Sequence, residues 1–478
     1  MGNKTMMTDL YELTMAQVYF NSNEKDKIAI FDAFFRKEPL NSGYGVMGGL
    51  DRIIEYIKNL RFTDENIKYL KSLKLFTNDF LNYLKNFKFT GDIYAIPDGT
   101  PVFRNEPLIT VKAPIIEAQI IETALLSYLN ASICYTTATK KVTEAAGDIA
   151  VMEFGARRAF GPDAALEASK CSIIGGAAGT SNVLAGEKYK VPVMGTMAHS
   201  LITQADSEYE AFLNYAKTYP TNCVLLVDTY DVLKSGVPNA IKVAKDYLIP
   251  NGYRLKGIRI DSGDLAYLSK ESKKMLIDAD MGDAKICLSN GLKPETIRTL
   301  IDQGAIIDSI GLGDNIVAPD NARVGCVYKN VGIIAGDEVI PKIKLSSDSE
   351  KTINPGFKKV YRFFDENTGY ALGDLIALHD EKIPTDEYTL IDPVDETNQT
   401  TITNYTFREL QEKIFEKGNL VYNDPSLFEK KAYCTNEMQT LYPEIRRIHK
   451  PHKYYVDLSE ELLALKKDLI MKNKNRTK

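Results

Sequence analysis

The sequence predicts an α/β protein whose central part is a parallel β/α barrel. From about residue 149 onward, short apolar stretches that often end in Gly or Asp alternate with helical stretches of ten or more residues. Continuous apolar strands separated by helices are typical of a parallel sheet that helices cover. Six or more such units favour a (β/α) barrel, regular or irregular, with its site at the carboxyl ends of the strands. The predicted strands are 149–154, 191–194, 223–227, 257–260, 285–288 and 308–310, and the predicted helices are 205–218, 238–248, 264–276 and 294–303.

Residues 1–135, ahead of the barrel, are predicted to form an α+β domain. Thr8 and Asp9 precede apolar residues at spacings of three and four, which indicates a capped helix over residues 10–20. Further helical patterns and short β-type runs separated by Pro and Gly follow, and the runs indicate a small sheet. The helical patterns are 49–60 and 63–87, and the β-type runs are 93–96, 101–103 and 108–111.

The barrel is assigned to residues 136–345, and residues 346–478 are assigned to an appended C-terminal region. Beyond about residue 345 the chain is rich in charged residues and turn formers. We therefore expect this region to consist largely of loops, to carry no chemistry of its own and to end in a polar helix over residues 457–472.

Composition excludes several classes of function. The chain has 478 residues, a net charge of -5, 44% hydrophobic and 26% charged residues, as ordinary water-soluble proteins do. It lacks the cationic excess that nucleic-acid binding requires, so no nucleic-acid partner is expected. The longest apolar region, 115–129, contains Glu117 and Glu122 and is shorter than the roughly 20 residues of a membrane span, so no membrane partner is expected.

Targeting signals and cysteine spacing favour a cytoplasmic protein. The first 17 residues contain Lys4, Asp9 and Glu12 where an export signal needs an apolar stretch, so we expect no export. The six cysteines form no Cys-x-x-Cys pair and no histidines cluster near them, which argues against a zinc site and favours a reducing compartment.

One histidine follows a predicted barrel strand. His199 lies in Gly195-Thr196-Met197-Ala198-His199-Ser200, directly after strand 191–194. A neutral imidazole, with a pKa of about 6.5, can act there as a base or as a nucleophile towards phosphorus. The alternative is a histidine that is hydrogen-bonded in a helix cap. The other histidines fall in the C-terminal region and are expected to be structural; they are His379, His449 and His452.

Arginines stand beside two strand ends. Arg157 and Arg158 follow strand 149–154, and Arg259 belongs to strand 257–260. A planar guanidinium suits a carboxylate or a phosphate. The alternative for each arginine is an ion pair with an acidic residue close in sequence, Glu153 or Asp261.

Acidic and amide side chains also fall at strand ends. Asp228, Asp261 and Asp264 have the chemistry to bind ribose hydroxyls or the Mg²⁺ carried by a diphosphate, or to cap helices. Capping is favoured for Asp264, which directly precedes a helical pattern. Ser289 and Asn290 end strand 285–288 and join the set that converges on this edge.

Two glycine-rich segments, 175–182 and 311–315, are candidates for phosphate binding through backbone N–H groups. The alternative is an ordinary turn or helix start, and neither segment matches a Walker A or Rossmann motif. Tyr11, on the first predicted helix, is expected either to pack or to stack on a flat substrate.

Read in order, six of these segments resemble nicotinate phosphoribosyltransferase over nearly the whole chain. The segments are Thr8-Asp9-Leu10-Tyr11-Glu12, Pro97-Asp98-Gly99-Thr100, Glu153-Phe154-Gly155-Ala156-Arg157-Arg158, Gly195-Thr196-Met197-Ala198-His199-Ser200, Arg259-Ile260-Asp261-Ser262-Gly263-Asp264 and Gly325-Cys326-Val327-Tyr328-Lys329. The resemblance implies an irregular barrel of the type II phosphoribosyltransferase kind, an N-terminal sandwich domain, and a homodimer with its sites near the subunit interface.

The resemblance also implies a reaction. Nicotinate and phosphoribosyl diphosphate would give nicotinate mononucleotide and diphosphate, the first step of NAD biosynthesis from nicotinate. ATP would phosphorylate His199, and Mg²⁺ would accompany the diphosphate. Tyr11, Arg157, Thr196 and Arg259 would surround nicotinate. We also predict that substrate contacts come from further residues at the strand ends, namely Asp261, Ser289, Asn290, Gly311, Gly313 and Asp314.

One position departs from the family pattern, in which Gly-x-Gly is often followed by Thr. Here Asp314 follows Gly313. Because a carboxylate repels phosphate, we expect this side chain to turn away and cap the next segment, or to hold Mg²⁺.

Three alternatives to this function stay open at this point. The same fold acts on nicotinamide or on quinolinate, although the arginines favour an acid and the quinolinate enzymes are much shorter. The third alternative is a non-catalytic relative that binds nucleotide.

Overall fold

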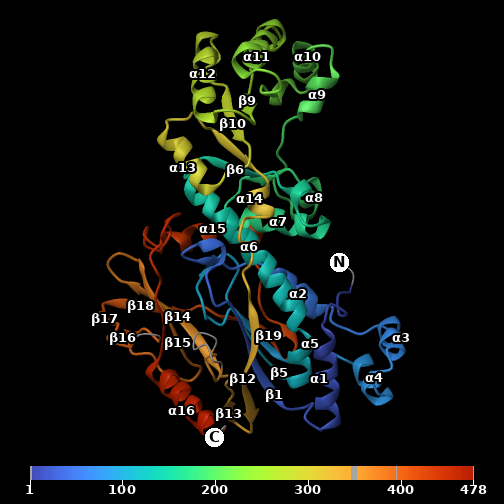
Figure 1. Ribbon diagram of the computed structural model, residues 1–478, viewed down its shortest axis with the longest axis vertical. Helices are drawn as coiled ribbons and strands as arrows, with labels where there is room; N and C mark the ends of the chain where they lie inside the picture. Colours follow the sequence, from blue (N-terminus) through green and yellow to red (C-terminus); the bar gives the residue numbers. More distant parts are fainter. Residues whose placement is uncertain (1–2, 346–351, 394–395, 477–478) are drawn as a thin grey trace. The chain divides into compact units, whose positions relative to one another are not determined.

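The computed structural model describes residues 3–345, 352–393 and 396–476 (Figure 1). The chain divides into two compact units. The central unit comprises residues 138–320, and the terminal unit combines residues up to 137 with those from 321 onward. The predicted three-part division stays a prediction, but the N-terminal and C-terminal regions contribute strands to one sheet. No helix in the described ranges is long and apolar enough to cross a membrane.

The central unit is built on a six-stranded parallel sheet in the order β7-β6-β11-β10-β9-β8. Val193 extends this sheet by a single parallel bridge to Thr180. No strand pairing among the described residues joins Val193 to β8, so the parallel β/α fold is confirmed in an irregular form. The strands are β6 (Ala150–Glu153), β7 (Gly179–Thr180), β8 (Val224–Leu226), β9 (Gly257–Ile260), β10 (Lys285–Ser289) and β11 (Ser309–Leu312).

Helices follow these strands, as the sequence predicts (Figure 1). The predicted helix at 238–248 is α-helical up to Val243 and widens to a π-helix over Ala244–Leu248. The helices are α7 (Pro162–Ile174), α8 (Val183–Tyr189), α9 (His199–Gln204), α10 (Glu208–Thr218), α11 (Val237–Val243), α12 (Leu265–Asp278), α13 (Pro294–Asp302) and α14 (Asp314–Val317).

The predicted strand at 191–194 is wrong. Its neighbour β7 is only two residues long, and Pro192 has no N–H to donate to a ladder. The segment instead makes two backbone hydrogen bonds around the bridge, from Thr180 N to Pro192 O and from Met194 N to Thr180 O.

The terminal unit contains a seven-stranded sheet in the order β13-β12-β1-β5-β3-β19-β20, in which every pairing is antiparallel. The sequence analysis missed β1, an inner strand of this sheet, although six of its seven residues are buried. The strands are β1 (Ile28–Phe34), β3 (Asp92–Ala95), β5 (Ile109–Pro114), β12 (Val327–Ala335), β13 (Glu338–Pro341), β19 (Glu412–Glu416) and β20 (Asn419–Leu420). The predicted run at 101–103 forms β4 (Pro101–Val102), which pairs with β2 (Gly45–Val46).

The first predicted helix is confirmed, but its predicted cap is wrong. Asp9 occupies the N-cap position of α1 (Leu10–Asn21) without a side-chain cap hydrogen bond. Its carboxylate instead accepts a hydrogen bond of 2.8 Å from the hydroxyl of Thr123. The helical pattern at 63–87 is two helices, because Thr77 caps the second one. The remaining helices in the N-terminal part of the chain are α2 (Leu50–Lys58), α3 (Asp64–Ser72), α4 (Asn78–Lys85), α5 (Ile115–Ile120) and α6 (Glu122–Ala146).

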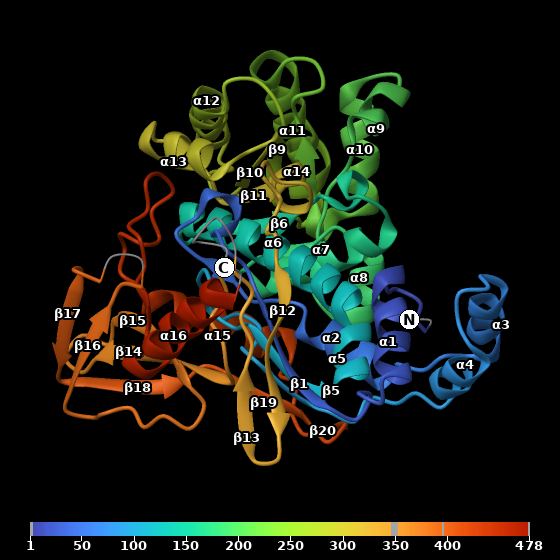
Figure 2. The ribbon, with the colours of Figure 1, turned by 60° about the horizontal axis from the view of Figure 1, so that its bottom comes forward.

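The expectation of a loop-rich C-terminal region is wrong (Figure 2). Residues 346–351, 394–395 and 477–478 lie outside the described residues, but the remainder contains a four-stranded sheet in the order β18-β14-β15-β21 and a hairpin of β16 and β17. Buried apolar residues of neighbouring strands, such as Phe363 and Leu375, form a core. Charged residues lie beside them in the sequence and make the strands hard to recognise. The elements are β14 (Lys358–Asp365), β15 (Ala371–Leu378), β16 (Glu387–Ile391), β17 (Gln399–Thr403), β18 (Tyr405–Glu409), β21 (Val456–Leu458), α15 (Leu427–Gln439) and the predicted terminal helix, α16 (Glu460–Arg476).

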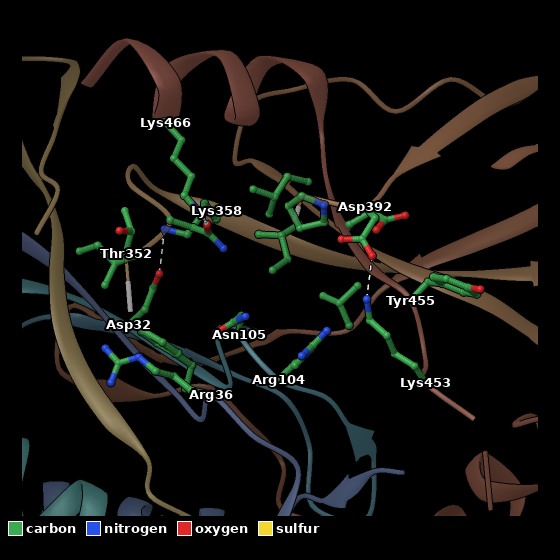
Figure 3. Close-up of a pocket in the computed structure, with 18 residues that line it drawn as sticks. Asp32, Arg36, Arg104, Asn105, Thr352, Lys358, Asp392, Lys453, Tyr455 and Lys466 are labelled. Atoms are coloured by element: carbon green, nitrogen blue, oxygen red, sulfur yellow. Dashed lines mark hydrogen bonds and ion pairs between the residues drawn. The ribbon is translucent and has the colours of Figure 1, made fainter. Parts of the chain in front are cut away.

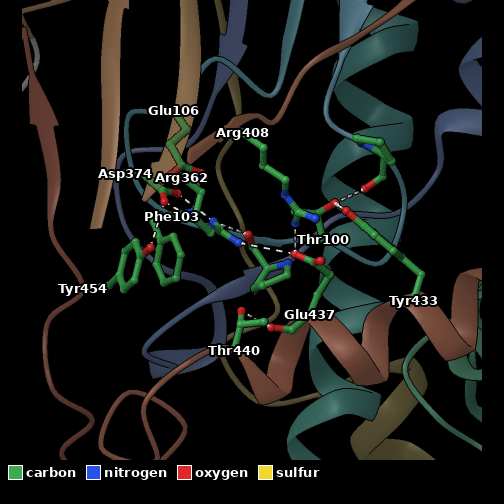
Figure 4. A network of polar contacts seen from close by, with 12 residues as sticks. Thr100, Phe103, Glu106, Arg362, Asp374, Arg408, Tyr433, Glu437, Thr440 and Tyr454 are labelled. Carbon is green, nitrogen blue, oxygen red and sulfur yellow. Dashed lines mark hydrogen bonds and ion pairs between the residues drawn. The ribbon is translucent and has the colours of Figure 1, made fainter. Parts of the chain in front are cut away.

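A buried charged network joins distant segments of the terminal unit (Figure 4). The guanidinium of Arg362, in β14, is fully buried and donates to both carboxylate oxygens of Asp374 at 2.8 and 2.6 Å. It also donates to the carbonyl of Pro101 at 2.9 Å, and Tyr454 donates to Asp374 at 2.8 Å. Burial and the neighbouring Asp374 raise the pKa of Glu106. One arginine thus compensates a group of buried acids.

Replacing this arginine should destabilise the terminal unit strongly. Arg362→Met leaves Asp374 buried without its cation, and breaking a buried pair in this way costs about 3–5 kcal/mol. Urea unfolding of the full chain measures the loss. Lys413→Met is the matched control, since the side chains of Lys413 and its partner Glu416 are 36% and 51% exposed, and loss of this ion pair should cost much less. Equal stability of the two variants would show that the fold does not depend on the Arg362 network.

Candidate functional site

The register of the central sheet brings several strand ends to one edge. Leu226 of β8 lies level with Arg259 of β9, and Ser289 of β10 lies level with Gly311 of β11. Because these strands are parallel, the residues that follow them emerge at the same edge of the sheet. The register therefore places Asp228, Arg259, Asp261 and Ser289 near one another, as the sequence predicts.

Arg259 lies at the centre of this edge. Its Nε donates to Ser289 Oγ at 2.9 Å, Nη1 to Thr196 Oγ1 at 3.3 Å and Nη2 to Asp261 Oδ1 at 3.1 Å. Ser289 in turn donates to the same oxygen of Asp261. We call Thr196, Arg259, Asp261 and Ser289 the Arg259 cluster. A guanidinium has five N–H donors, so two remain without a partner among the described residues.

A phenylalanine ring supports the guanidinium from one side. The Arg259 guanidinium carbon lies 5.6 Å from the ring centre of Phe154. The Phe154 backbone N–H donates to Leu312 O at 2.5 Å, and a Cβ atom at position 311 would come within 2.5 Å of the ring. Gly311 is therefore required to admit the ring, a packing reason that the glycine pattern alone does not reveal.

His199 begins α9 and pairs with a buried carboxylate. Its Nε2 lies 3.1 Å from Asp228 Oδ1, and the side chains of His199 and Asp228 are 43% and 1% exposed. Ser262 donates to the other oxygen of Asp228 at 2.6 Å. A carboxylate only accepts hydrogen bonds, so in the neutral tautomer that fits this contact Nε2 carries the proton and Nδ1 has the lone pair. This pairing replaces the predicted alternative of a histidine held in a helix cap.

The carboxylate of Glu153 has a structural role. It is fully buried and accepts hydrogen bonds from the Ser169 hydroxyl at 2.9 Å, from the Thr180 hydroxyl and from the Gly155 backbone N–H. It therefore does not neutralise Arg157, whose exposed guanidinium has no partner among the described residues. For Arg259 the pairing alternative is confirmed in part, because Asp261 takes one of its donors.

The first glycine-rich segment lies away from the strand ends. Gly175 and Gly176 terminate α7 and precede β7, so they lie at the amino end of the parallel sheet. Only the end of the segment follows a strand, and there Asn182 caps α8 by accepting from Ala185 N at 3.3 Å. For Gly175 and Gly176 this placement favours the alternative of an ordinary turn.

The second glycine-rich segment does follow a strand, β11. Gly313 occupies the N-cap position of α14 and Asp314 its first helical residue, without a side-chain cap hydrogen bond. The predicted capping role of Asp314 is wrong, because its carboxylate faces Arg158 Nε at 3.4 Å. This ion pair explains how the loop tolerates a carboxylate.

An asparagine that the sequence reading missed holds the adjoining loop. Asn315 donates from its amide to Gly291 O at 3.0 Å and to Leu292 O at 2.7 Å. The preceding Asn290 has a φ of +114°, which is unusual for a residue other than glycine and is often found at binding sites. Asn290 therefore stays a candidate for substrate contact.

The other candidate residues are placed by local structure. Asp264 caps α12 by accepting from Tyr267 N at 3.0 Å, which confirms the prediction. Tyr11 lies on α1 in the terminal unit, so the sheet of the central unit does not position it. Burial and the neighbouring Glu122 raise the pKa of Tyr11, so its hydroxyl stays protonated.

No group of three or more His, Cys, Asp or Glu side chains in the described part of the chain is placed to hold a metal ion. One oxygen of Asp261, Oδ2, accepts no hydrogen bond from the described residues. Mg²⁺ is commonly bound by one or two carboxylates together with substrate phosphates and water. The donor set at the Arg259 cluster therefore fits Mg²⁺ that arrives with a diphosphate.

A cavity of about 680 Å³ adjoins the cluster, and Thr196 is part of its wall. Sequence reasoning missed the two tyrosines that line it: Tyr215 lies on α10, and Tyr219 is the residue that follows the end of this helix. Their ring centres lie 5.1 Å apart. The full lining is Thr196, Met197, Ala198, Leu201, Gln204, Ala205, Ala211, Asn214, Tyr215, Thr218 and Tyr219.

Family models for nicotinate phosphoribosyltransferase match three stretches of the chain. They describe the N-terminal domain over residues 6–130, the family itself over residues 149–318 and the C-terminal domain over residues 357–466. The nicotinate phosphoribosyltransferase of Bacillus subtilis (strain 168) is 42% identical over 476 residues, which cover 99% of this chain and 96% of that protein. The chain belongs to the nicotinate phosphoribosyltransferase family.

Further comparisons agree with this membership. The nicotinate phosphoribosyltransferase of Caenorhabditis elegans is 33% identical over 98% of this chain and 93% of its own length. The crystal structure of human nicotinic acid phosphoribosyltransferase superposes with a TM-score of 0.84 at 28% identity, covering 97% of this chain and 99% of that one. A nicotinate-nucleotide pyrophosphorylase from Pyrococcus furiosus, at 22% identity and a TM-score of 0.70 over 92% and 96% of the two chains, shares the fold. The Arg259 cluster and His199 lie in the stretch that the central family model matches.

Proposed function

We propose that this member of the nicotinate phosphoribosyltransferase family transfers phosphoribose from phosphoribosyl diphosphate to nicotinate, and that ATP hydrolysis through a phosphorylated His199 drives the transfer. The products are nicotinate mononucleotide and diphosphate. The observation that carries the proposal is the pairing of half-exposed His199 with buried Asp228 beside the Arg259 cluster. In this arrangement His199 can accept a phosphoryl group, and Arg259 can bind the carboxylate of the substrate.

Arg259 is the proposed partner of the nicotinate carboxylate. Its two remaining N–H donors and its support by Phe154 suit a planar, negatively charged group. Nicotinamide has no carboxylate and would leave these donors unpaired, which favours the acid as substrate. Arg157, whose exposed guanidinium has no partner among the described residues, is the second candidate for binding the nicotinate carboxylate.

The transfer itself breaks the bond between the anomeric carbon and the diphosphate oxygen and forms a bond from that carbon to the pyridine nitrogen. The protein positions the two reactants and neutralises charge, which is the main source of acceleration for such a displacement. Asp261 Oδ2 and backbone N–H groups of the 311–314 loop are the proposed contacts for the metal and the phosphates. Mg²⁺ would neutralise the leaving diphosphate.

Phosphorylation uses the free nitrogen of His199. In this step Nδ1 attacks the γ-phosphorus of ATP, the bond to the ADP oxygen breaks, and Nε2 keeps its proton. Asp228 stabilises the positive charge that the ring acquires, because its carboxylate lies 3.1 Å from Nε2 and is almost fully shielded from water. The phosphohistidine is then hydrolysed, which couples ATP consumption to nucleotide formation.

The proposal includes a homodimer in the reducing cytoplasm. Four large apolar residues on α1 are exposed, which supports burial of this helix against a second copy; they are Leu10, Tyr11, Met15 and Val18. All six cysteines are unpaired, which supports a reducing compartment.

The phosphohistidine is testable by labelling. Incubation with ATP labelled in its γ-phosphate should give an acid-labile, base-stable adduct on the protein, linked through Nδ1 of His199. His199→Ala should remove the label. His449→Ala is the control, because this exposed histidine lies in the terminal unit and its loss should leave the label unchanged. Labelling of His199→Ala at the wild-type level, or linkage through Nε2, would refute the phosphorylation scheme.

Recognition of nicotinate is testable by steady-state kinetics. Losing one partner of a charge-assisted pair costs on the order of 2 kcal/mol, so Arg259→Ala should raise the KM for nicotinate at least about tenfold. If Arg157 contributes to recognition, Arg157→Ala shares the effect. Arg158→Ala serves as the control, since its described partner is Asp314. An unchanged KM in both the Arg259 and Arg157 variants would leave the carboxylate without a partner.

A further inference from the structure

A second cavity, of about 210 Å³, lies within the terminal unit and has cationic walls (Figure 3). It is bounded by residues of β1, β14, β15, β21 and α16 and by the segment at residues 104–105. Five cationic side chains but only three acidic ones line it. The cations are Arg36, Arg104, Lys358, Lys453 and Lys466, and the acids are Asp32, Asp392 and Asp457.

Two of the cations are neutralised by ion pairs within the wall. Lys358 contacts Asp32 at 2.8 Å with both side chains buried, and Lys453 contacts Asp392 at 2.7 Å. The third acid, Asp457, interacts with Asp392 and Lys453, and burial raises its pKa to about 6. Two of the three acids are thus paired with lysines, and the cations of the wall still outnumber the acids.

Three cations remain without a carboxylate partner among the described residues, namely Arg36, Arg104 and Lys466. Figure 3 shows Lys466 reaching into the cavity from α16, while Arg36 and Arg104 approach from the opposite side. The ammonium of Lys466 has one described contact, a hydrogen bond of 2.8 Å to Asn354 Oδ1. The free positive charges thus face one space from two sides.

The positive charge that lines the cavity affects the pKa of Lys466. Burial and the positive charge of Lys358 lower the pKa of Lys466 to about 8. A partly buried ammonium without a counter-charge is unfavourable, and an anion in the cavity would offset this cost. Two guanidinium forks opposite an ammonium match the oxygen atoms of a phosphate group.

We propose that this cavity binds a small phosphate-bearing anion, either inorganic phosphate or diphosphate. Its volume is below the roughly 300 Å³ at which sites for drug-sized ligands begin, so it suits one such group better than a whole nucleotide. The site uses none of the residues assigned to phosphoribosyl transfer and stands independently of that proposal.

Isothermal titration calorimetry and hydrogen exchange of the full chain test this site, with inorganic phosphate and diphosphate as separate probes. Exchange resolves the two units, so anion binding near His199 registers in residues 196–204 and binding in this cavity registers in residues 353–360 and 456–466. We expect at least one probe to protect the latter segments. Their protection by neither probe would overturn the proposal.

The variants sharpen the result. Lys466→Met keeps the aliphatic length and removes the charge, so it should weaken the binding that protects residues 353–360 at least about tenfold. Lys467→Met is the matched control, because the next residue of α16 is exposed and pairs with Glu396. Arg104→Ala, at a half-buried position, gives the same test should the lysine variant fold poorly. Wild-type affinity in both cavity variants would overturn the proposal, whereas loss confined to them supports it.

Discussion

Arg259 donates hydrogen bonds to side chains from three separate parts of the central sheet edge. Thr196 follows the Val193 bridge, Ser289 ends β10, and Asp261 follows β9 itself. A guanidinium has its donors in one plane at fixed angles, so satisfying all three contacts fixes the three segments relative to one another. Phe154, from a fourth segment, packs its ring against the guanidinium, and a side chain at position 311 would collide with this ring.

The histidine depends on the same geometry. Asp228 follows β8 and binds both His199 and Ser262, and Ser262 is the residue directly after Asp261. The Arg259 cluster and the His199 pair are thus linked twice through the backbone, by residues 196–199 and by residues 261–262. We therefore expect a change that displaces Arg259 to affect the histidine as well, so that the proposed substrate binding and the proposed phosphorylation respond together to mutations at this edge.

The sequence predicted the edge well because it depends on local patterns. Apolar strands followed by polar residues identify the carboxyl ends of parallel strands, and Arg259, Asp261, Ser289 and His199 were all found from this pattern. Contacts between residues distant in sequence could not be predicted. Strand β1 contains Asp32 in an apolar run, and the Lys358 that neutralises this residue lies 326 positions later. The C-terminal strands were missed for the same reason, because their core forms only when residues distant in sequence pack together. The substrate roles of Tyr11, Arg157 and Asn290 stay predictions, since they depend on ligand contacts.

The identity of the product tests the central claim most directly. The full chain would be supplied with phosphoribosyl diphosphate, ATP, Mg²⁺ and equal amounts of nicotinate and nicotinamide. The nucleotides formed would then be separated and identified by mass spectrometry. The proposed recognition of the carboxylate by Arg259 predicts nicotinate mononucleotide, with nicotinamide mononucleotide no higher than in an enzyme-free control. Nicotinamide mononucleotide as the main product, or consumption of neither pyridine, would contradict the account.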